Sequence, residues 1–314
     1  METEKSNHVN KITAASLLIA LGIIYGDIGT SPLYVLKAVV LDRTIEEVLV
    51  LGGVSCIFWT LVFQTTLKYI VLTLRADNEG EGGIFSLYSL VRRYGKKLII
   101  PTILGATTLL ADGIITPPIS VSSAVEGLEI VPGVGHIPTV PIVIGILSLI
   151  FFMQRFGTQK VGSTFGPVMV IWFSMLFIVG ISQIIHYPDV FKALNPMYAY
   201  NLLVLYPKGF WLLGAVFLCT TGAEALYSDL GHCGKRNIQL SWIYVFACLI
   251  LNYMGQSVWC LQHEGGLLNN ESPFYALIPS AYLSYFILLA TMATIIASQA
   301  LISGCFTLIS EAIK

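Results

Sequence analysis

Three acidic residues, Asp27, Asp112 and Glu224, stand inside long apolar runs of this 314-residue sequence. A charged side chain at the centre of a membrane helix costs on the order of 2.5 to 3.5 kcal/mol even on lenient insertion scales. No Lys or Arg falls at a comparable depth in any apolar run, so a buried ion pair does not explain these acids. The remaining partners are protons, metal ions or a substrate, and for each acid the alternative is a protonated structural residue.

Hydroxyl side chains follow one of these acids at helical spacing. Asp112, Thr116 and Ser120 are separated by four residues each, which places them on one face of a helix. This face therefore presents a carboxylate and two hydroxyls as oxygen ligands. Alternatively, the two hydroxyls bond back to carbonyls that Pro117 and Pro118 leave without an amide partner.

The surroundings of Glu224 contain a similar set of groups. Thr221 precedes the acid by about one helical turn, Gly222 is close to it, and Tyr227 follows it by about one turn. We expect Thr221 to be an ion ligand, with helix packing as the alternative. Glu224 is also the candidate for carrying a coupled proton, because a carboxylate in a low-dielectric site near other acids binds a proton more readily than an exposed one.

The surroundings of Asp27 predict a broken helix. Gly26, Gly29 and Pro32 all weaken helical structure within a run that is otherwise apolar enough to span a membrane. An unwound segment exposes backbone carbonyls, which a membrane protein tolerates only where the segment lines a cavity. Carbonyls beside a carboxylate would make a cation site, and broken helices in corresponding positions of two repeats are typical of transporters.

The elements that carry these residues are membrane helices. Hydrophobic residues make up 55% of the chain and charged residues 11%, against about a quarter in soluble domains, and the mean hydropathy is +0.78. The apolar runs do not alternate in polarity as barrel strands do, so the expected fold class is an all-α polytopic membrane protein. The eight expected spans are 12–36, 48–73, 98–125, 138–154, 163–186, 209–231, 240–262 and 279–312.

The distribution of positive charge predicts the orientation. With a cytoplasmic N-terminus, thirteen of the seventeen Lys and Arg residues fall inside and four fall outside. This bias favours a multi-pass plasma membrane protein whose N-terminus is cytoplasmic. Residues 1–11 lack the features of a cleaved signal peptide. The four outside residues are Lys37, Arg43, Lys192 and Lys208.

The chain is expected to form a single transmembrane domain. Residues 1–11 are its cytoplasmic N-terminus, 12–186 a first repeat of five helices, 187–208 an extracellular connection with partial helix, and 209–314 the first three helices of a second repeat. A short helix over 83–94 is expected on the cytoplasmic side, because its apolar residues recur near helical spacing.

Several other functions lack support in the sequence. A net charge of -1 and the absence of a basic patch argue against nucleic acid binding. The six cysteines show no zinc-binding spacing. No hydrolase, metalloprotease or phosphate-loop motif occurs, and the signatures of intramembrane aspartyl proteases are missing, so we expect neither an enzyme nor a cofactor.

Five stretches resemble the signature motifs of the KUP (HAK/KUP/KT) potassium uptake permeases, which belong to the amino acid-polyamine-organocation superfamily. They are "YGDIGTSPLY", "RADNEGEGGI", "GIITPPISVSSAVEGLEI", "TGAEALYSDLGH" and "ASQALISGCF", in the family's order and spread along almost the whole chain. The resemblance implies potassium uptake by potassium/proton symport, through an inverted-repeat fold in which helices one and six are broken. Two repeats of five helices need ten, so the chain is expected to be the N-terminal transmembrane part of such a permease.

The resemblance also implies which residues handle ions. Potassium would be bound at Asp27, Asp112, Thr116 and Glu224, although some relatives have glutamate where Asp112 stands. The expected partners are potassium, protons and the lipid bilayer, with a second copy of the chain as a further candidate. Two alternatives stay open: a membrane fragment that does not transport, and a permease of the same fold for an organic substrate. The ion-handling residues implied together are Asp27, Tyr34, Asp112, Thr116, Ser120, Thr221 and Glu224.

Overall fold

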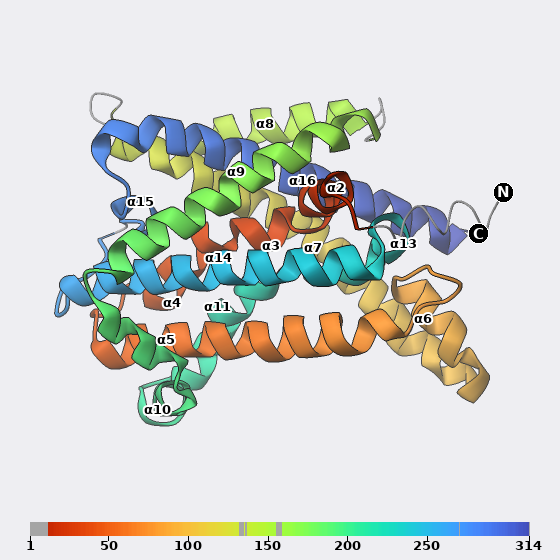
Figure 1. The fold of residues 1–314 in the computed structure, drawn as a ribbon, viewed down its shortest axis with the longest axis horizontal. Coiled ribbons are helices and arrows are strands. Elements are labelled where there is room, and N and C mark those ends of the chain that lie inside the picture. Colours follow the sequence, from red (N-terminus) through yellow and green to blue (C-terminus); the bar gives the residue numbers. More distant parts are fainter. Residues whose placement is uncertain (1–11, 132–134, 136, 155–158, 270, 314) are drawn as a thin grey trace.

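The computed structural model describes residues 12–131, 135, 137–154, 159–269 and 271–313. The described residues form helices and turns without a β-strand, so the predicted all-α fold class is confirmed. Most of the long helices run along the longest axis of the molecule, and the C-terminal end of α16 (Leu283–Ile313) lies at the same end of the bundle as the short helix α6 (Figure 1).

The first expected span is sharply bent. Helix α2 (Ala14–Ile24) is capped at its start by the Thr13 side chain, and the chain then turns by 71° into the segment Gly26–Leu33. That segment comprises the short helix α3 (Gly26–Thr30) and the 3-10 turn η1 (Ser31–Leu33), followed by α4 (Val35–Val40).

The second span changes its helical type halfway. Helix α5 (Glu47–Thr60) continues as a π-helix, η2 (Leu61–Leu72), and ends in the 3-10 turn η3 (Thr73–Arg75). Within the π-helix, the Thr66 hydroxyl donates to the carbonyl of Leu61, five residues earlier. This i to i−5 bond matches the π-helical backbone spacing.

The third span and its approach follow the expected ranges. Helix α6 (Ile84–Val91), continued by η4 (Arg92–Tyr94), lies within the short helix expected over 83–94. After the turn η5 (Lys96–Leu98), helix α7 (Ile99–Glu126) continues through Pro117 and Pro118 and ends in η6 (Gly127–Ile130).

The next elements complete the first half of the chain. Helices α8 (Thr139–Gln154) and α9 (Gln159–Ile184) correspond to the fourth and fifth spans. The expected connection over 187–208 contains η7 (Pro188–Leu194) and α10 (Pro196–Leu205). Helix α10 packs tightly on α5, because a Cβ at Gly52 would lie 2.6 Å from Cβ of Leu202.

The sixth span is a series of short pieces. It runs through η8 (Gly209–Leu212), α11 (Leu213–Phe217) and η9 (Leu218–Thr220), turns over residues 221–224, and resumes as α12 (Ala225–Ser228) and α13 (Leu230–Cys233). Gly222 has a φ of +81°, a left-handed conformation that glycine adopts without steric cost.

The last spans are long and regular. Helix α14 (Lys235–Gln262) crosses α9 closely, since Gly255 and Gly180 meet backbone to backbone. The loop that follows carries α15 (Pro273–Ala276) and η10 (Ser280–Tyr282), and α16 (Leu283–Ile313) ends the described chain.

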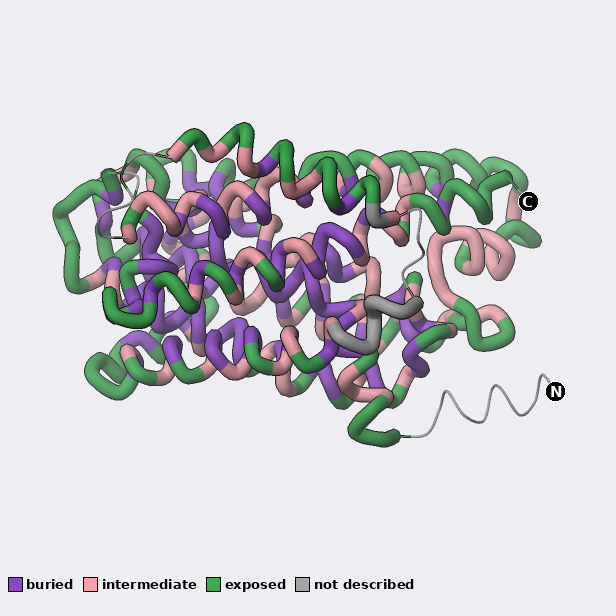
Figure 2. Tube along the Cα trace, turned by 90° about the horizontal axis from the view of Figure 1, so that it is seen from above, coloured by how far each residue is buried: buried purple, intermediate pink, exposed green. Residues whose placement is uncertain are grey.

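Helices therefore occupy all eight expected ranges, but not all of them are equally long. In the described part of the chain six helices are long and apolar enough to cross a membrane, or seven if the bent pair in the first span counts as one. The remaining helix, α8, occupies the fourth expected range and is an apolar helix shorter than a full span. Buried positions gather in the middle of the bundle (Figure 2). Only 17% of the apolar window in Lys96–Ile130 is buried, against 61% in Lys235–Gln262.

Candidate functional site

The three intramembrane acids, which lie far apart in the sequence, come together in the bundle. Asp27 lies just after the bend of the first span, Asp112 in the middle of α7, and Glu224 in the turn that interrupts the sixth span. They are close enough for the charge of Asp27 to interact with those of both Asp112 and Glu224. Asp27 is buried, with 6% of its surface exposed, whereas the other two are half-buried.

Two carboxylate oxygens at this site have no hydrogen-bond partner among the described residues. They are Oδ2 of Asp27 and Oδ2 of Asp112, and both are buried. The Asp112 carboxyl lies beside the carboxyl of Glu224, so a proton on either acid would join the two. A buried polar oxygen without a partner carries the full cost of losing its water, which about 90% or more of buried polar groups avoid. The other Asp112 oxygen, Oδ1, accepts a 2.6 Å hydrogen bond from Oγ1 of Thr116. Thr116 thus bonds to the acid one turn earlier on the predicted face of α7.

The remaining hydroxyls form short links between elements around the acids. The Tyr34 hydroxyl lies 3.2 Å from Oγ1 of Thr221, joining the first span to the turn in the sixth. Thr30 Oγ1 lies 3.5 Å from Oγ of Ser120 on α7 and donates to the Asp27 carbonyl. The structure thus brings the predicted Tyr34, Ser120 and Thr221 to the same region as the acids. Thr30 was missed, although it stands three residues after Asp27 in the sequence.

The backbone at the bend is less available than the sequence suggests. The carbonyl of Gly29 accepts a 2.8 Å hydrogen bond from Nε1 of Trp172, and that of Pro32 accepts one of 2.9 Å from Nε2 of Gln256. Thr30 and Ser31 bond to the carbonyls of residues 27 and 28. The expectation of free carbonyls is therefore wrong for these four, each of which already has a donor. The unused capacity lies mainly in the carboxylates.

Gly222 brings the two interrupted spans into direct contact. A Cβ placed on Gly222 would lie 2.6 Å from Cβ and 2.8 Å from Oδ2 of Asp27. No other residue type fits this position without displacing the acid, and its φ of +81° disfavours other residues as well. The turn in the sixth span therefore forms one wall around Asp27.

A cavity of about 270 Å³ opens beside Glu224. It is also lined by Lys68, an exposed residue of the π-helix η2. No ion pair between Lys68 and Glu224 is found in the described part of the chain, so this lysine does not neutralise the acid. The sequence signals the place of Lys68 in this cavity only weakly, since nothing in the spacing relates residue 68 to residue 224. The cavity is lined by Gln64, Lys68, Tyr69, Phe217, Thr220, Ala223 and Glu224.

The acids are neighbours without forming a compact metal cage. Among the described residues no group of three or more His, Cys, Asp or Glu side chains is arranged to hold a metal ion. A compact dication site would need such convergence of charged ligands. Among the described residues the three acids therefore lie near one another without converging on one point.

Comparison with known proteins places these features in a family. Residues 14–314 match the family described as "K+ potassium transporter integral membrane domain". Two similar proteins are the "Probable potassium transport system protein Kup" of Cytophaga hutchinsonii, 59% identical over 99% of this chain and 48% of the relative, and that of Flavobacterium johnsoniae, 56% identical over 100% and 49%. A third, "Probable potassium transport system protein Kup 1" of Lactococcus lactis subsp. lactis, is 50% identical over 100% and 49%. The chain spans about half the length of these relatives. No solved structure matches.

Proposed function

Because this chain belongs to the family of Kup potassium transporters, we propose that it supplies the ion-binding part of a potassium uptake permease. The observation that carries this proposal is the pair of buried, unpartnered carboxylate oxygens on Asp27 and Asp112, in a site with no compact metal cage among the described residues. Such oxygens are costly unless a cation or a proton occupies them. The proposed activity is transport rather than catalysis, since the family is one of transporters.

Potassium is proposed to bind at Asp27, Asp112, Thr116 and Glu224. Asp27 and Asp112 offer free oxygens, and Thr116 keeps Asp112 oriented through its hydrogen bond. Glu224 interacts electrostatically with Asp27 and also lines the cavity that contains Lys68. The neighbouring hydroxyls that we assign to the same ion path are those of Tyr34, Ser120 and Thr221.

Uptake is proposed to be coupled to protons, with Glu224 as the coupling residue. Three acids within interaction range of one another are not all ionised at once unless a cation neutralises part of their charge. A proton on Glu224 and a potassium ion at Asp27 therefore influence each other's binding. An amino acid substrate is less suited to this site, because its own carboxylate would meet three acids.

The proposal includes an orientation in the plasma membrane. The C-terminal end of α16 and the helix α6 lie at one end of the bundle, which we assign to the cytoplasm together with the N-terminus from the distribution of Lys and Arg (Figure 1). A homodimer is also part of the proposal. It is supported by the large exposed apolar area of α7, where Ile100, Leu104 and Ile114 each expose 64% or more.

The test is to substitute Asp27 by Asn, which removes the charge and keeps the shape. We expect uptake of rubidium, as a potassium tracer, to fall about tenfold or more, since one lost charged ligand is worth at least a factor of ten. The matched control is Asp189→Asn, because Asp189 is exposed and pairs only with Lys192 at the surface. Uptake should be measured in vesicles that contain the protein as its whole reading frame encodes it. Wild-type uptake by well-folded Asp27→Asn would contradict the proposal.

A further inference from the structure

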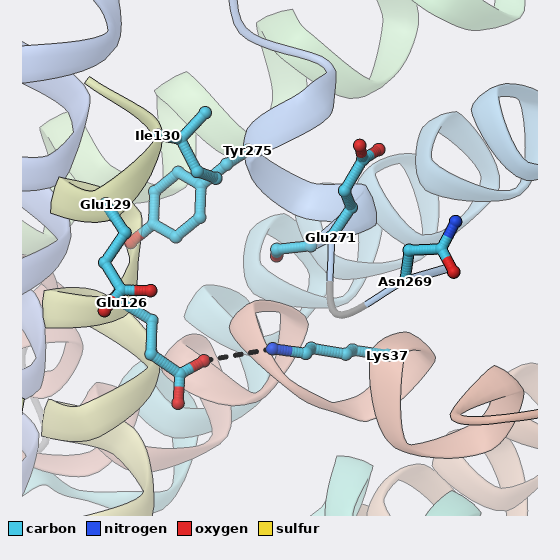
Figure 3. Close-up of a pocket in the computed structure, with 8 residues that line it drawn as sticks. Lys37, Glu126, Glu129, Ile130, Asn269, Glu271 and Tyr275 are labelled. Carbon is cyan, nitrogen blue, oxygen red and sulfur yellow. Dashed lines mark hydrogen bonds and ion pairs between the residues drawn. The ribbon is translucent and has the colours of Figure 1, made fainter. Parts of the chain in front are cut away.

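A second polar cavity, of about 200 Å³, lies at the opposite end of the bundle from α6. In Figure 3, Glu126 and Glu129 lie on one side of this cavity, and the side chain of Lys37 extends from α4 to Glu126. Asn269 and Glu271 border the cavity from the loop before α15. We call this set, together with Ile130, Ser272 and Tyr275, the outer pocket. It is separate from the three intramembrane acids, none of which lines it.

The outer pocket is acidic in spite of its lysine. Among its lining residues, Glu126, Glu129 and Glu271 contribute three carboxylates, whereas Lys37 contributes one ammonium. Asn269 and Ser272 add neutral oxygen atoms. Carboxylate, amide and hydroxyl oxygens together are the ligand set that hard cations prefer.

An unsatisfied hydroxyl adds an independent observation. Ser272 exposes only 8% of its surface, and its Oγ has no hydrogen-bond partner among the described residues. The residue directly precedes α15, yet its side chain does not cap that helix. A buried hydroxyl lining a polar cavity is costly when it is left without a partner. Ser272 therefore indicates a ligand in the outer pocket to which a hydroxyl oxygen can bind.

Lys37 already occupies the place of a cation. Its Nζ lies 3.1 Å from Oε2 of Glu126, and this ion pair ties the end of the first span to the end of α7. The two side chains are 21% and 41% exposed, and partly exposed ion pairs contribute little net stability. A free monovalent cation carries the same charge as the ammonium, so it can replace Lys37 without changing the charge of the outer pocket.

We infer that the outer pocket binds an alkali cation from the external solution in exchange for the Lys37 ammonium, which releases the contact between the first span and α7. This inference rests on the proposed function for its orientation and for the choice of a monovalent cation. The pocket would act as a first stop for the ion before the intramembrane acids. Lys37 would act as a tethered competitor that keeps the pocket occupied when no ion is bound.

The test measures how easily Lys37 reacts with an amine reagent that does not cross membranes. Vesicles containing the protein are labelled from outside in potassium chloride or in choline chloride of equal ionic strength, and the modified lysines are quantified by mass spectrometry. Lys192 is the internal control, because it forms an exposed 3.3 Å ion pair with Asp189 that responds to salt alone. We expect potassium to raise the labelling of Lys37 several-fold and to leave Lys192 unchanged. Equal labelling in both salts, or a parallel rise at both lysines, would overturn the inference.

Variants connect the effect to the outer pocket. Glu271→Gln and Ser272→Ala should each raise the potassium concentration for half-maximal labelling by about three- to tenfold, the effect of losing one ligand among several. Asp42→Asn, which removes an exposed carboxylate of the loop after α4 that does not line the pocket, should leave it unchanged. An unaltered response in both pocket variants would reject the site.

The same measurement separates this inference from the proposed function. In Asp27→Asn the potassium effect on Lys37 should persist, because that residue is remote from the outer pocket. Loss of the effect in Asp27→Asn would mean that it originates at the intramembrane acids, and the inference would fail. If wild-type vesicles take up no rubidium but Lys37 still responds to potassium, the proposed function fails and the outer site stands.

Discussion

At the scale of single residues, the chemistry rests on acids that share their surroundings. Asp27, Asp112 and Glu224 come from three different spans, yet their charges interact, and two of their oxygens have no partner among the described residues. Like charges this close are tolerated when protons or cations reduce the total charge. In the function proposed above, the cation and the coupled proton therefore occupy the same group of side chains.

Substituting Glu224 by Gln tests which residue carries the coupled proton. The amide cannot be ionised, so potassium accumulation driven by an inward proton gradient should be lost, while exchange of rubidium for potassium without a gradient should continue. The measurement compares gradient-driven accumulation with exchange in the same vesicles. If accumulation survives in Glu224→Gln, the coupling proton lies elsewhere, and Asp112 is the next residue to test.

The sequence predicted these acids and their hydroxyl neighbours, but not the groups that come from distant segments. An acid within an apolar run is visible in any single window, and so is the four-residue spacing of Asp112 and Thr116. Trp172, which donates a hydrogen bond to the Gly29 carbonyl, lies 143 residues away in the chain, and no periodicity connects the two residues. The ion pair of Lys37 and Glu126, which are 89 residues apart, could not be predicted for the same reason.

At the scale of elements, the site depends on two interruptions that meet. The first span bends by 71° after Ile24, and the sixth turns at residues 221–224, where Gly222 lies against Asp27. Gly26, Gly29 and Pro32 predicted the interruption of the first span from the sequence. The π-helix η2 was not predicted, because hydropathy marks an apolar helix without distinguishing its hydrogen-bond spacing.

Gly222→Ala should disable the site through the backbone. An alanine there must adopt a φ of +81° and place its Cβ within 2.8 Å of Oδ2 of Asp27, so we expect at least about a tenfold loss of rubidium uptake. Gly214→Ala is the matched control, since a Cβ at Gly214 in α11 meets nothing within 4 Å and alanine favours a helix. Elution as a single symmetric peak in detergent establishes that each variant is folded. Uptake equal to that of the control would contradict the close contact.

At the scale of the whole molecule, the bundle has two polar cavities at different heights and a tightly packed middle. The cavity beside Glu224 includes Lys68 of the second span, and the outer pocket lies at the far end from α6. Helices α9 and α14 pack closely in the bundle, where they meet through Gly180 and Gly255.

The bend in the first span is fastened to that packed middle. Trp172 of α9 and Gln256 of α14 hold the carbonyls of Gly29 and Pro32, and the Tyr25 hydroxyl donates to the carbonyl of Ile238 in α14. Although α3 has only five residues, it should not behave as a loosely wound loop. In hydrogen-deuterium exchange its amides should exchange as slowly as those of α14, and faster in Trp172→Phe than in Trp211→Phe, which alters an indole that is 77% exposed. Fast exchange over residues 26–33 in the unsubstituted chain would mean that the bend opens by itself. Slow exchange would mean that the bend stays fastened to α9 and α14 and does not unwind independently of them.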